Sequence, residues 1–207
     1  MSMLRPWRGR VWAKGDTPAS VASVPNLISV ARILLTPVFV LVLLADEGRL
    51  GAERLVAAVL FIVLIATDFV DGQIARRRGL VTDFGKLIDP IADKFITGSG
   101  FVMLSVLGEL PWAVTVLILL REWGITIHRL VVADRVVIPA SFSGKAKTFA
   151  QAIALPMWLV PTWLWLGEWV HWANAAAMAA AFGLTLWSGL EYVWHWGRGR
   201  RAGGGRA

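Results

Sequence analysis

Residues 68–93 read DFVDGQIARRRGLVTDFGKLIDPIAD and join two strongly apolar segments of the chain. The stretch holds two pairs of carboxylates, Asp68 with Asp71 and Asp89 with Asp93. Each carboxylate placed inside a bilayer costs roughly 2.5 to 3.5 kcal/mol on insertion scales. A chain that keeps four of them at the edge of apolar segments needs a compensating partner, and we expect that partner to be a divalent metal.

Helix geometry turns this spacing into a predicted site. Asp68 and Asp71 are three positions apart and Asp89 and Asp93 are four apart, so each pair lies on one face of its helix. Two such pairs at neighbouring helix ends can converge on one point. A ligand set of oxygens, without His or Cys, favours magnesium or manganese over zinc. Two ions about 3.5 to 4 Å apart, bridged by shared carboxylates, suit phosphoryl-type transfer.

The smaller residues between the aspartates fit the same interpretation. Gly72 and Ala75 keep one helix face open to a ligand, and Arg76 offers a planar, permanently charged fork to a phosphate. Structural alternatives exist for each feature. Asp89 before Pro90 is a good N-cap, the first aspartate pair could bind Arg76 or the arginines beside it, and those arginines could be ordinary stop-transfer charges.

The rest of the chain has the composition of a membrane protein. It has 207 residues, of which 57% are hydrophobic, and a mean hydropathy of +0.62. Stretches of about 20 apolar residues mark candidate membrane spans. They predict an all-α, polytopic bundle of six transmembrane helices, at residues 27–45, 55–71, 90–107, 111–132, 148–166 and 170–194.

The 21 basic residues are distributed unevenly over the predicted loops. When each basic residue is assigned to the loop nearest to it, one side of the membrane receives groups of four, five, four and four. The opposite side receives only Arg49 and Arg54. The positive-inside rule therefore places both termini and the aspartates on the cytoplasmic side of the cell membrane. Arg32 and Arg121 remain, and both lie within predicted spans.

Three regions are predicted along the chain. Residues 1–24 form a basic interfacial segment, 25–196 the six-span domain, and 197–207 a disordered basic tail. The net charge of +7 belongs to a face that meets anionic membrane lipids, and its scatter around the spans argues against a nucleic-acid partner. Residues 175–183 form a small-residue face suited to close helix packing, within one chain or between two copies.

Residues 68–93 resemble the signature of the CDP-alcohol phosphatidyltransferases, D(x)2DG(x)2AR(x)8G(x)3D(x)3D, and match it at every fixed position. The six-span layout extends the resemblance over most of the chain. The resemblance implies two Mg²⁺ or Mn²⁺ ions, a CDP-diacylglycerol donor, attack by an acceptor hydroxyl on the lipid-side phosphorus, and CMP as the leaving group. It implies a homodimer as well, although an internal helix contact is an equal alternative.

The resemblance also assigns residues to roles. Asp93 is implied to be the general base, a choice between Asp93 and Asp89 that the residues alone leave open. The metal ligands are implied to be Asp68, Asp71, Asp89 and Asp93. Contacts to the CDP-linked lipid are implied for Asn26, Arg32, Asp68, Asp71, Gly72, Ala75, Arg76, Thr82, Gly85 and Asp89.

The acceptor is predicted from residues outside the signature. Arg121 lies mid-span, where an unpaired guanidinium is expensive; an internal salt bridge with Glu122 or a motif aspartate is the alternative. Residues 141–148, SFSGKAKT, place Lys145 and Lys147 in a glycine-containing loop before a helix N-terminus, a plausible anion site; ordinary inner-side charge is the alternative. Arg121, Lys145, Lys147 and Thr148 together favour an acceptor that carries its own phosphate.

These residues are similar to those of family members whose acceptor is glycerol 3-phosphate. The similarity lies in the Arg121–Glu122 pair, in a GK(x)KT(x)2Q-like stretch from Gly144 to Gln151, and in the start of the first span. The predicted reaction is transfer of a phosphatidyl group from CDP-diacylglycerol to glycerol 3-phosphate. Two alternatives remain: a sister enzyme that uses inositol phosphate or phosphatidylglycerol, and a metal or proton transporter with buried carboxylates.

Overall fold

A computed structural model describes residues 24–78, 83–132 and 141–203, and these residues contain helices and turns but no strand. The helices are α1 (Val24–Ala45), α2 (Ala52–Arg78), α3 (Asp83–Val106), α4 (Trp112–Val132), α5 (Phe142–Leu159), α6 (Trp163–Leu166) and α7 (Glu168–Gly203). The predicted all-α class is therefore confirmed. The predicted segments 1–24 and 197–207 lie largely or partly outside the described residues.

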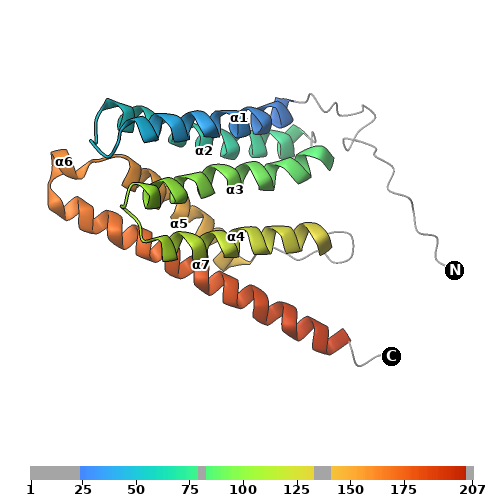
Figure 1. Cartoon of the computed structure of the whole chain (residues 1–207). Helices are drawn as coiled ribbons and strands as arrows, with labels where there is room; N and C mark the ends of the chain where they lie inside the picture. The colour runs from blue at the N-terminus through green and yellow to red at the C-terminus, as the bar shows by residue number, and fades with distance from the viewer. Residues whose placement is uncertain (1–23, 79–82, 133–140, 204–207) are drawn as a thin grey trace.

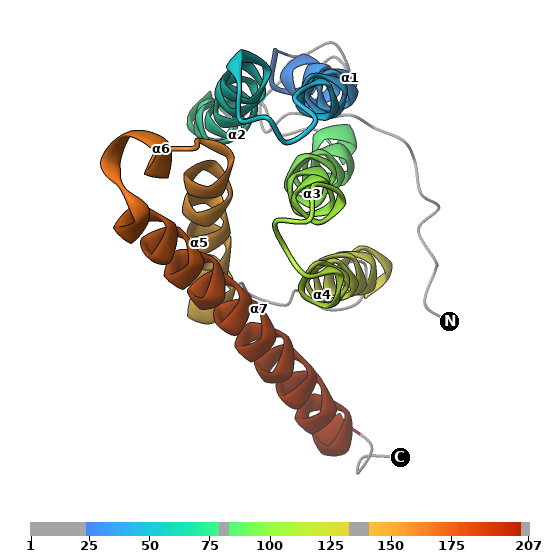
Figure 2. The same ribbon diagram turned by 60° about the vertical axis from the view of Figure 1, so that its left-hand side comes forward.

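The six long helices form a closed ring. Neighbours around it are α1, α2, α5, α7, α4 and α3, and α3 packs back against α1 (Figures 1 and 2). The short helix α6 leads into α7, which runs past α5 and α4. Because successive long helices alternate in direction, the start of α1, the end of α2, the start of α3, the end of α4 and the start of α5 lie at one end of the bundle.

The core of this ring is apolar and tightly packed. Phe39 of α1 and Phe61 of α2 are fully buried, with ring centroids 5.1 Å apart. Gly100 of α3 lies so close to Phe61 that a Cβ atom there would come within 2.9 Å of the ring. A larger residue at position 100 would therefore force α2 and α3 apart.

The exterior is apolar as well, which a water-soluble bundle would not tolerate. Leu34, Leu41, Leu120, Phe149 and Leu190 are each at least 66% exposed, on four different helices. Within the residues that the structure describes, two helices have the length and apolar composition of membrane spans, over Asn26–Ala45 and Glu168–Trp196. The protein is thus membrane-associated, and the full set of six spans remains a prediction.

Helix boundaries differ from the apolar stretches in two places near the site. Helix α2 continues to Arg78, past Asp71, and α3 begins at Asp83, well before Pro90. Hydropathy detects the part of a helix that suits lipid, whereas the helix itself extends into the polar boundary region. The N-cap alternative for Asp89 is therefore wrong, because Asp89 lies inside α3.

The fifth apolar stretch is not one continuous helix. Helix α5 begins at Phe142 and ends at Leu159, and Val160 follows in an extended conformation with φ −83° and ψ 115°. The cause is Pro161, since the residue before a proline is pushed out of the helical region. At the other end of the chain α7 continues to Gly203, beyond Gly197, where the sequence predicts the tail to begin.

Candidate active site

Three of the four predicted metal ligands have described side chains, and they lie near one another. Asp68 is on α2, and the carboxylates of Asp89 and Asp93 on α3 are close enough to interact with it electrostatically. Asp71 lies on the same helix as Asp68, but its side chain is outside the described set. The helices therefore bring both predicted pairs to one end of the bundle.

Helix α1 supplies partners to two of these carboxylates. Arg32, only 1% exposed, forms an ion pair with Asp68. Ser29 donates a hydrogen bond to Asp89 Oδ1 at 2.7 Å. One turn further along α1, the buried Thr36 hydroxyl donates to the Arg32 backbone carbonyl at 2.8 Å. Partners of this kind orient carboxylates, as second-shell groups do around metal sites.

The remaining predicted donor-lipid residues are described unevenly. Asn26, on the first turns of α1, is 2% exposed, and Gly85 is buried in α3. Gly72, Ala75 and Arg76 lie within the helical part of α2, but their side chains are outside the described set. Thr82 falls in the segment between α2 and α3, which lies outside the described residues.

The donor atoms of the aspartate cluster fit a divalent metal. Carboxylate oxygens without His or Cys are the ligands that Mg²⁺ and Mn²⁺ prefer. Among the described side chains, which exclude that of Asp71, no three His, Cys, Asp or Glu groups already form a metal-binding set. The fit therefore rests on donor chemistry and on the convergence of Asp68, Asp89 and Asp93.

A second cluster of charges extends from Asp93 on α3 to side chains of α4 and α5. Lys94 Nζ is 2.6 Å from Asp93 Oδ2 and 3.1 Å from Glu122 Oε2. Lys147 Nζ donates to Glu122 Oε1 at 2.5 Å, and Arg121 Nη1 donates to the same oxygen at 3.0 Å. Glu122 is therefore a shared counter-ion for three cations from α3, α4 and α5.

Arg121 also contacts α7. Its Nη2 donates to Ser188 Oγ at 2.9 Å, and a Cβ atom on the neighbouring Gly189 would come within 3.1 Å of Arg121 Cγ. A larger residue at position 189 would therefore press on the Arg121 side chain. Among the described residues, Arg121 Nε is buried and has no hydrogen-bond partner.

The predicted acceptor residues fall into a buried or partly buried pair and an exposed pair. Arg121 and Lys147 lie together on Glu122, and the internal salt bridge considered from the sequence is present. Lys145 and Thr148 are both exposed, and the Thr148 hydroxyl donates to the Gly144 carbonyl at 3.1 Å.

The prediction of a loop over residues 141–148 is wrong, because α5 already begins at Phe142. Ser141 is its N-cap, and the Ser141 hydroxyl oxygen accepts a hydrogen bond from the Gly144 backbone N–H at 3.1 Å. Positions 145 and 147 then lie on different faces of one helix.

Sequence reasoning missed several contributors. The sequence carries no signal for Ser29, its charge pattern counts Lys94 among the inner-side charges, and it presents Glu122 only together with Arg121. The available signal was an acid in the middle of an apolar span, which is expensive unless it is paired.

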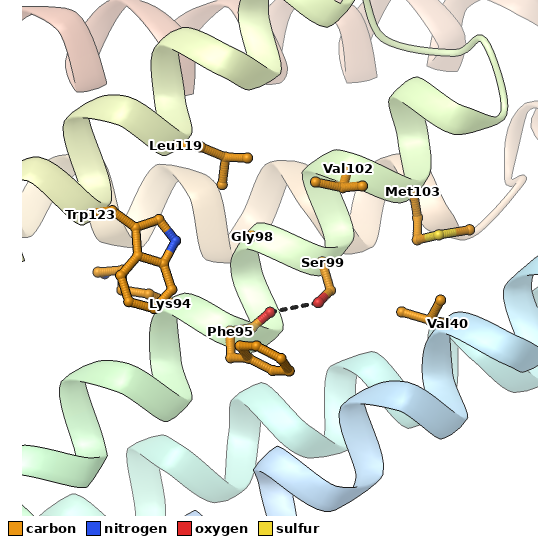
Figure 3. A pocket seen from close by; sticks show the side chains of 9 residues that line it. All are labelled: Val40, Lys94, Phe95, Gly98, Ser99, Val102, Met103, Leu119 and Trp123. Atoms are coloured by element: carbon orange, nitrogen blue, oxygen red, sulfur yellow. Dashed lines mark hydrogen bonds between the residues drawn. The ribbon is translucent and has the colours of Figure 1, made fainter.

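An apolar hollow of about 240 Å³ opens beside Lys94 (Figure 3). Phe95, Val102, Leu119 and Trp123 are among its lining side chains, from α3 and α4. Its lining suits a hydrocarbon chain, and Lys94 places it next to Asp93.

An apolar helical bundle with clustered carboxylates and cations at one end is the arrangement of a membrane-associated protein that handles charged groups. The family description "CDP-alcohol phosphatidyltransferase" matches residues 22–187. The chain belongs to the CDP-alcohol phosphatidyltransferase family. Members of this family generally use divalent metal ions.

Individual relatives are similar over most of the chain. A "Probable phosphatidylglycerophosphate synthase" of Mycobacterium tuberculosis is 46% identical over 175 residues, covering 84% of this chain and 82% of the relative. A "CDP-diacylglycerol--glycerol-3-phosphate 3-phosphatidyltransferase" of Bacillus subtilis is 39% identical, covering 82% and 93%. A protein of the same name from Escherichia coli K12 is 33% identical, covering 83% and 93%.

Proposed function

We propose that the protein transfers the phosphatidyl group of CDP-diacylglycerol to glycerol 3-phosphate, giving phosphatidylglycerophosphate and CMP. The observation that carries this proposal is the buried cation cluster on Glu122 beside the signature aspartates. The names of relatives that cover four-fifths of the chain support it. Because the chain belongs to a transferase family, the transporter alternative is set aside.

The residues of the aspartate cluster hold and orient the donor. Asp68, Asp71, Asp89 and Asp93 would bind two ions, Mg²⁺ or Mn²⁺. When bound, the metal ions supply positive charge that neutralises the diphosphate. Arg32 and Ser29 keep two of the carboxylates oriented. Asn26, Gly72, Ala75, Arg76, Thr82 and Gly85 complete the proposed contacts to the CDP-linked lipid.

Asp93 is the proposed general base. It accepts the proton of the acceptor hydroxyl, whose oxygen then forms a bond to the lipid-side phosphorus of the donor. The bond from that phosphorus to the CMP oxygen breaks, and CMP leaves with the electron pair. Such proton transfer by a positioned carboxylate contributes about 10²- to 10⁴-fold to the rate.

The acceptor phosphate is held by Arg121 and Lys147, with Lys145 and Thr148 at the exposed edge. A guanidinium and an ammonium are both suited to donate charge-assisted hydrogen bonds to phosphate oxygens. We propose that residues 25–196 form the catalytic domain and cross the cell membrane six times. Both termini and the active site then lie on the cytoplasmic side of that membrane. A homodimer belongs to the same proposal.

An acceptor panel tests the reaction directly. We expect the purified full chain in detergent to release CMP from CDP-diacylglycerol with glycerol 3-phosphate, and not with inositol phosphate, serine or phosphatidylglycerol. Chelator should abolish the release, and Mg²⁺ or Mn²⁺ should restore it. Turnover with inositol phosphate and none with glycerol 3-phosphate would replace this proposal by the sister-enzyme alternative.

Substitution of Arg121 tests the acceptor site. Removing one charge-assisted bond to phosphate costs roughly 1.5 to 3 kcal/mol, so Arg121→Ala should raise the KM for glycerol 3-phosphate about 10- to 150-fold. Arg121→Lys keeps the charge without the fork and should give a smaller rise. The matched control is Arg129→Lys, on the same helix but stacked over Tyr192 at 5.4 Å. An unchanged acceptor KM in both Arg121 variants would remove Arg121 from the site.

A further inference from the structure

The buried carboxylate of Glu122 pairs with cations from three helices. Its side chain is 4% exposed, and each of its two oxygens lies within 3.1 Å of a cationic nitrogen. Oε1 receives Lys147 of α5 and Arg121 of α4, and Oε2 faces Lys94 of α3 at 3.1 Å. Neither the signature nor the acceptor residues predicted from the sequence include this group.

The cations around Glu122 depend on it. Lys147 is 3% exposed and Lys94 13% exposed, so neither ammonium is fully hydrated. Taking such charges out of water is expensive unless an opposite charge lies in contact, and three cations drawn together also repel one another. The Glu122 carboxylate permits them to share one small region.

The cluster is nevertheless positive. Three cations surround one carboxylate, and an excess positive charge remains even when Asp93, the second partner of Lys94, is counted. Glu122 therefore gathers the cations without cancelling them. A site of this kind suits an anionic group carried by a small ligand.

We propose that Glu122 is a positioning residue for a phosphate-bearing acceptor. It holds Lys147 and Arg121 beside each other, so that both cations can serve one acceptor phosphate, and through Lys94 it links this pair to Asp93. Ser188 of α7 holds Arg121 through a hydrogen bond from Nη2, 2.9 Å long. This inference rests on the proposed function, because it concerns the same acceptor.

The test is Glu122→Gln in the full chain, assayed by CMP release in detergent. The amide keeps the shape but loses the charge that gathers the cations, so the KM for glycerol 3-phosphate should rise at least about tenfold. The KM for CDP-diacylglycerol should change by less than about threefold, since the donor contacts lie on α1, α2 and α3. Glu122→Asp, which restores the charge on a shorter arm, should recover part of the loss.

Glu168→Gln, the same chemical change on the exposed first turn of α7, is the control and should leave both KM values unchanged. A normal acceptor KM in Glu122→Gln would overturn the inference. So would an equal rise in both KM values, which a general loss of structure produces, or a lower acceptor KM, which would mean that Glu122 competes with the phosphate. Should Glu122→Gln fail to fold, Glu122→Asp carries the same comparison.

A double-substitution cycle separates positioning from an independent effect. If Glu122 acts through Lys147, adding Glu122→Gln to Lys147→Met should raise the acceptor KM by much less than it does in the native background. Fully additive effects would overturn the inference. Wild-type protein that releases no CMP with glycerol 3-phosphate would instead contradict the proposed function, so the two failures are distinguishable.

Discussion

Asp93→Asn is expected to lower kcat by about 10²- to 10⁴-fold, because an amide cannot take the proton of the acceptor hydroxyl. The fold should survive the change. Lys94, which lies 2.6 Å from Asp93, keeps Glu122 as a second partner at 3.1 Å, so no buried cation loses its last counter-ion. Steady-state rates of CMP release, with donor and acceptor varied separately, measure the effect.

The control is Glu53→Gln, the same loss of a carboxylate on the exposed first turn of α2, at the opposite end of the bundle. It should leave the rate unchanged. If Asp93→Asn kept more than about a tenth of the wild-type kcat, Asp93 would not be the base. If donor binding fell as much as kcat, its role would be confined to holding the donor.

Arg54→Ala is expected to destabilise the protein by about 3 kcal/mol, because it removes a fully buried guanidinium and leaves the partly buried Glu109 carboxylate without its partner. Arg54 is fully buried, and its Nη1 and Nη2 each donate to Glu109 at 2.6 Å. Its Nε donates to the Leu159 carbonyl at 3.0 Å, which satisfies a free acceptor at the end of α5. One side chain thus joins α2, the α3–α4 turn and α5.

Denaturant or thermal unfolding in detergent measures the loss. Arg49→Ala provides the matched control, because its pair with Glu47 is 75% and 64% exposed, and it should not shift the midpoint measurably. Arg54→Met combined with Glu109→Leu should be less damaging than Arg54→Ala, since no charge is then left unpaired. Equal midpoints for Arg54→Ala and the wild type would show that the pair contributes nothing.

Arg54 also shows where reasoning from the sequence stops. The charge pattern counts it as a residue of the outer side, together with Arg49. The structure buries Arg54 and leaves Arg49 exposed. The two arginines are five positions apart in the chain, in similar surroundings. Their burial differs because Arg54 donates to the carbonyl of Leu159, a residue 105 positions away.

The amino-acid sequence by itself determined the helical class and the pairing of the aspartates on two helices, because helical periodicity and apolar length are local properties. The tertiary structure alone decided which charges meet. Ser29 and Asp89 are 60 positions apart, and Lys147 and Glu122 are 25 apart. It also decided the different burial of the two lysines. Because α5 starts at Phe142, Lys145 lies on an exposed face of this helix and Lys147 on a buried face. Contacts of this kind depend on how helices pack around a ring, and no local pattern in the chain encodes them.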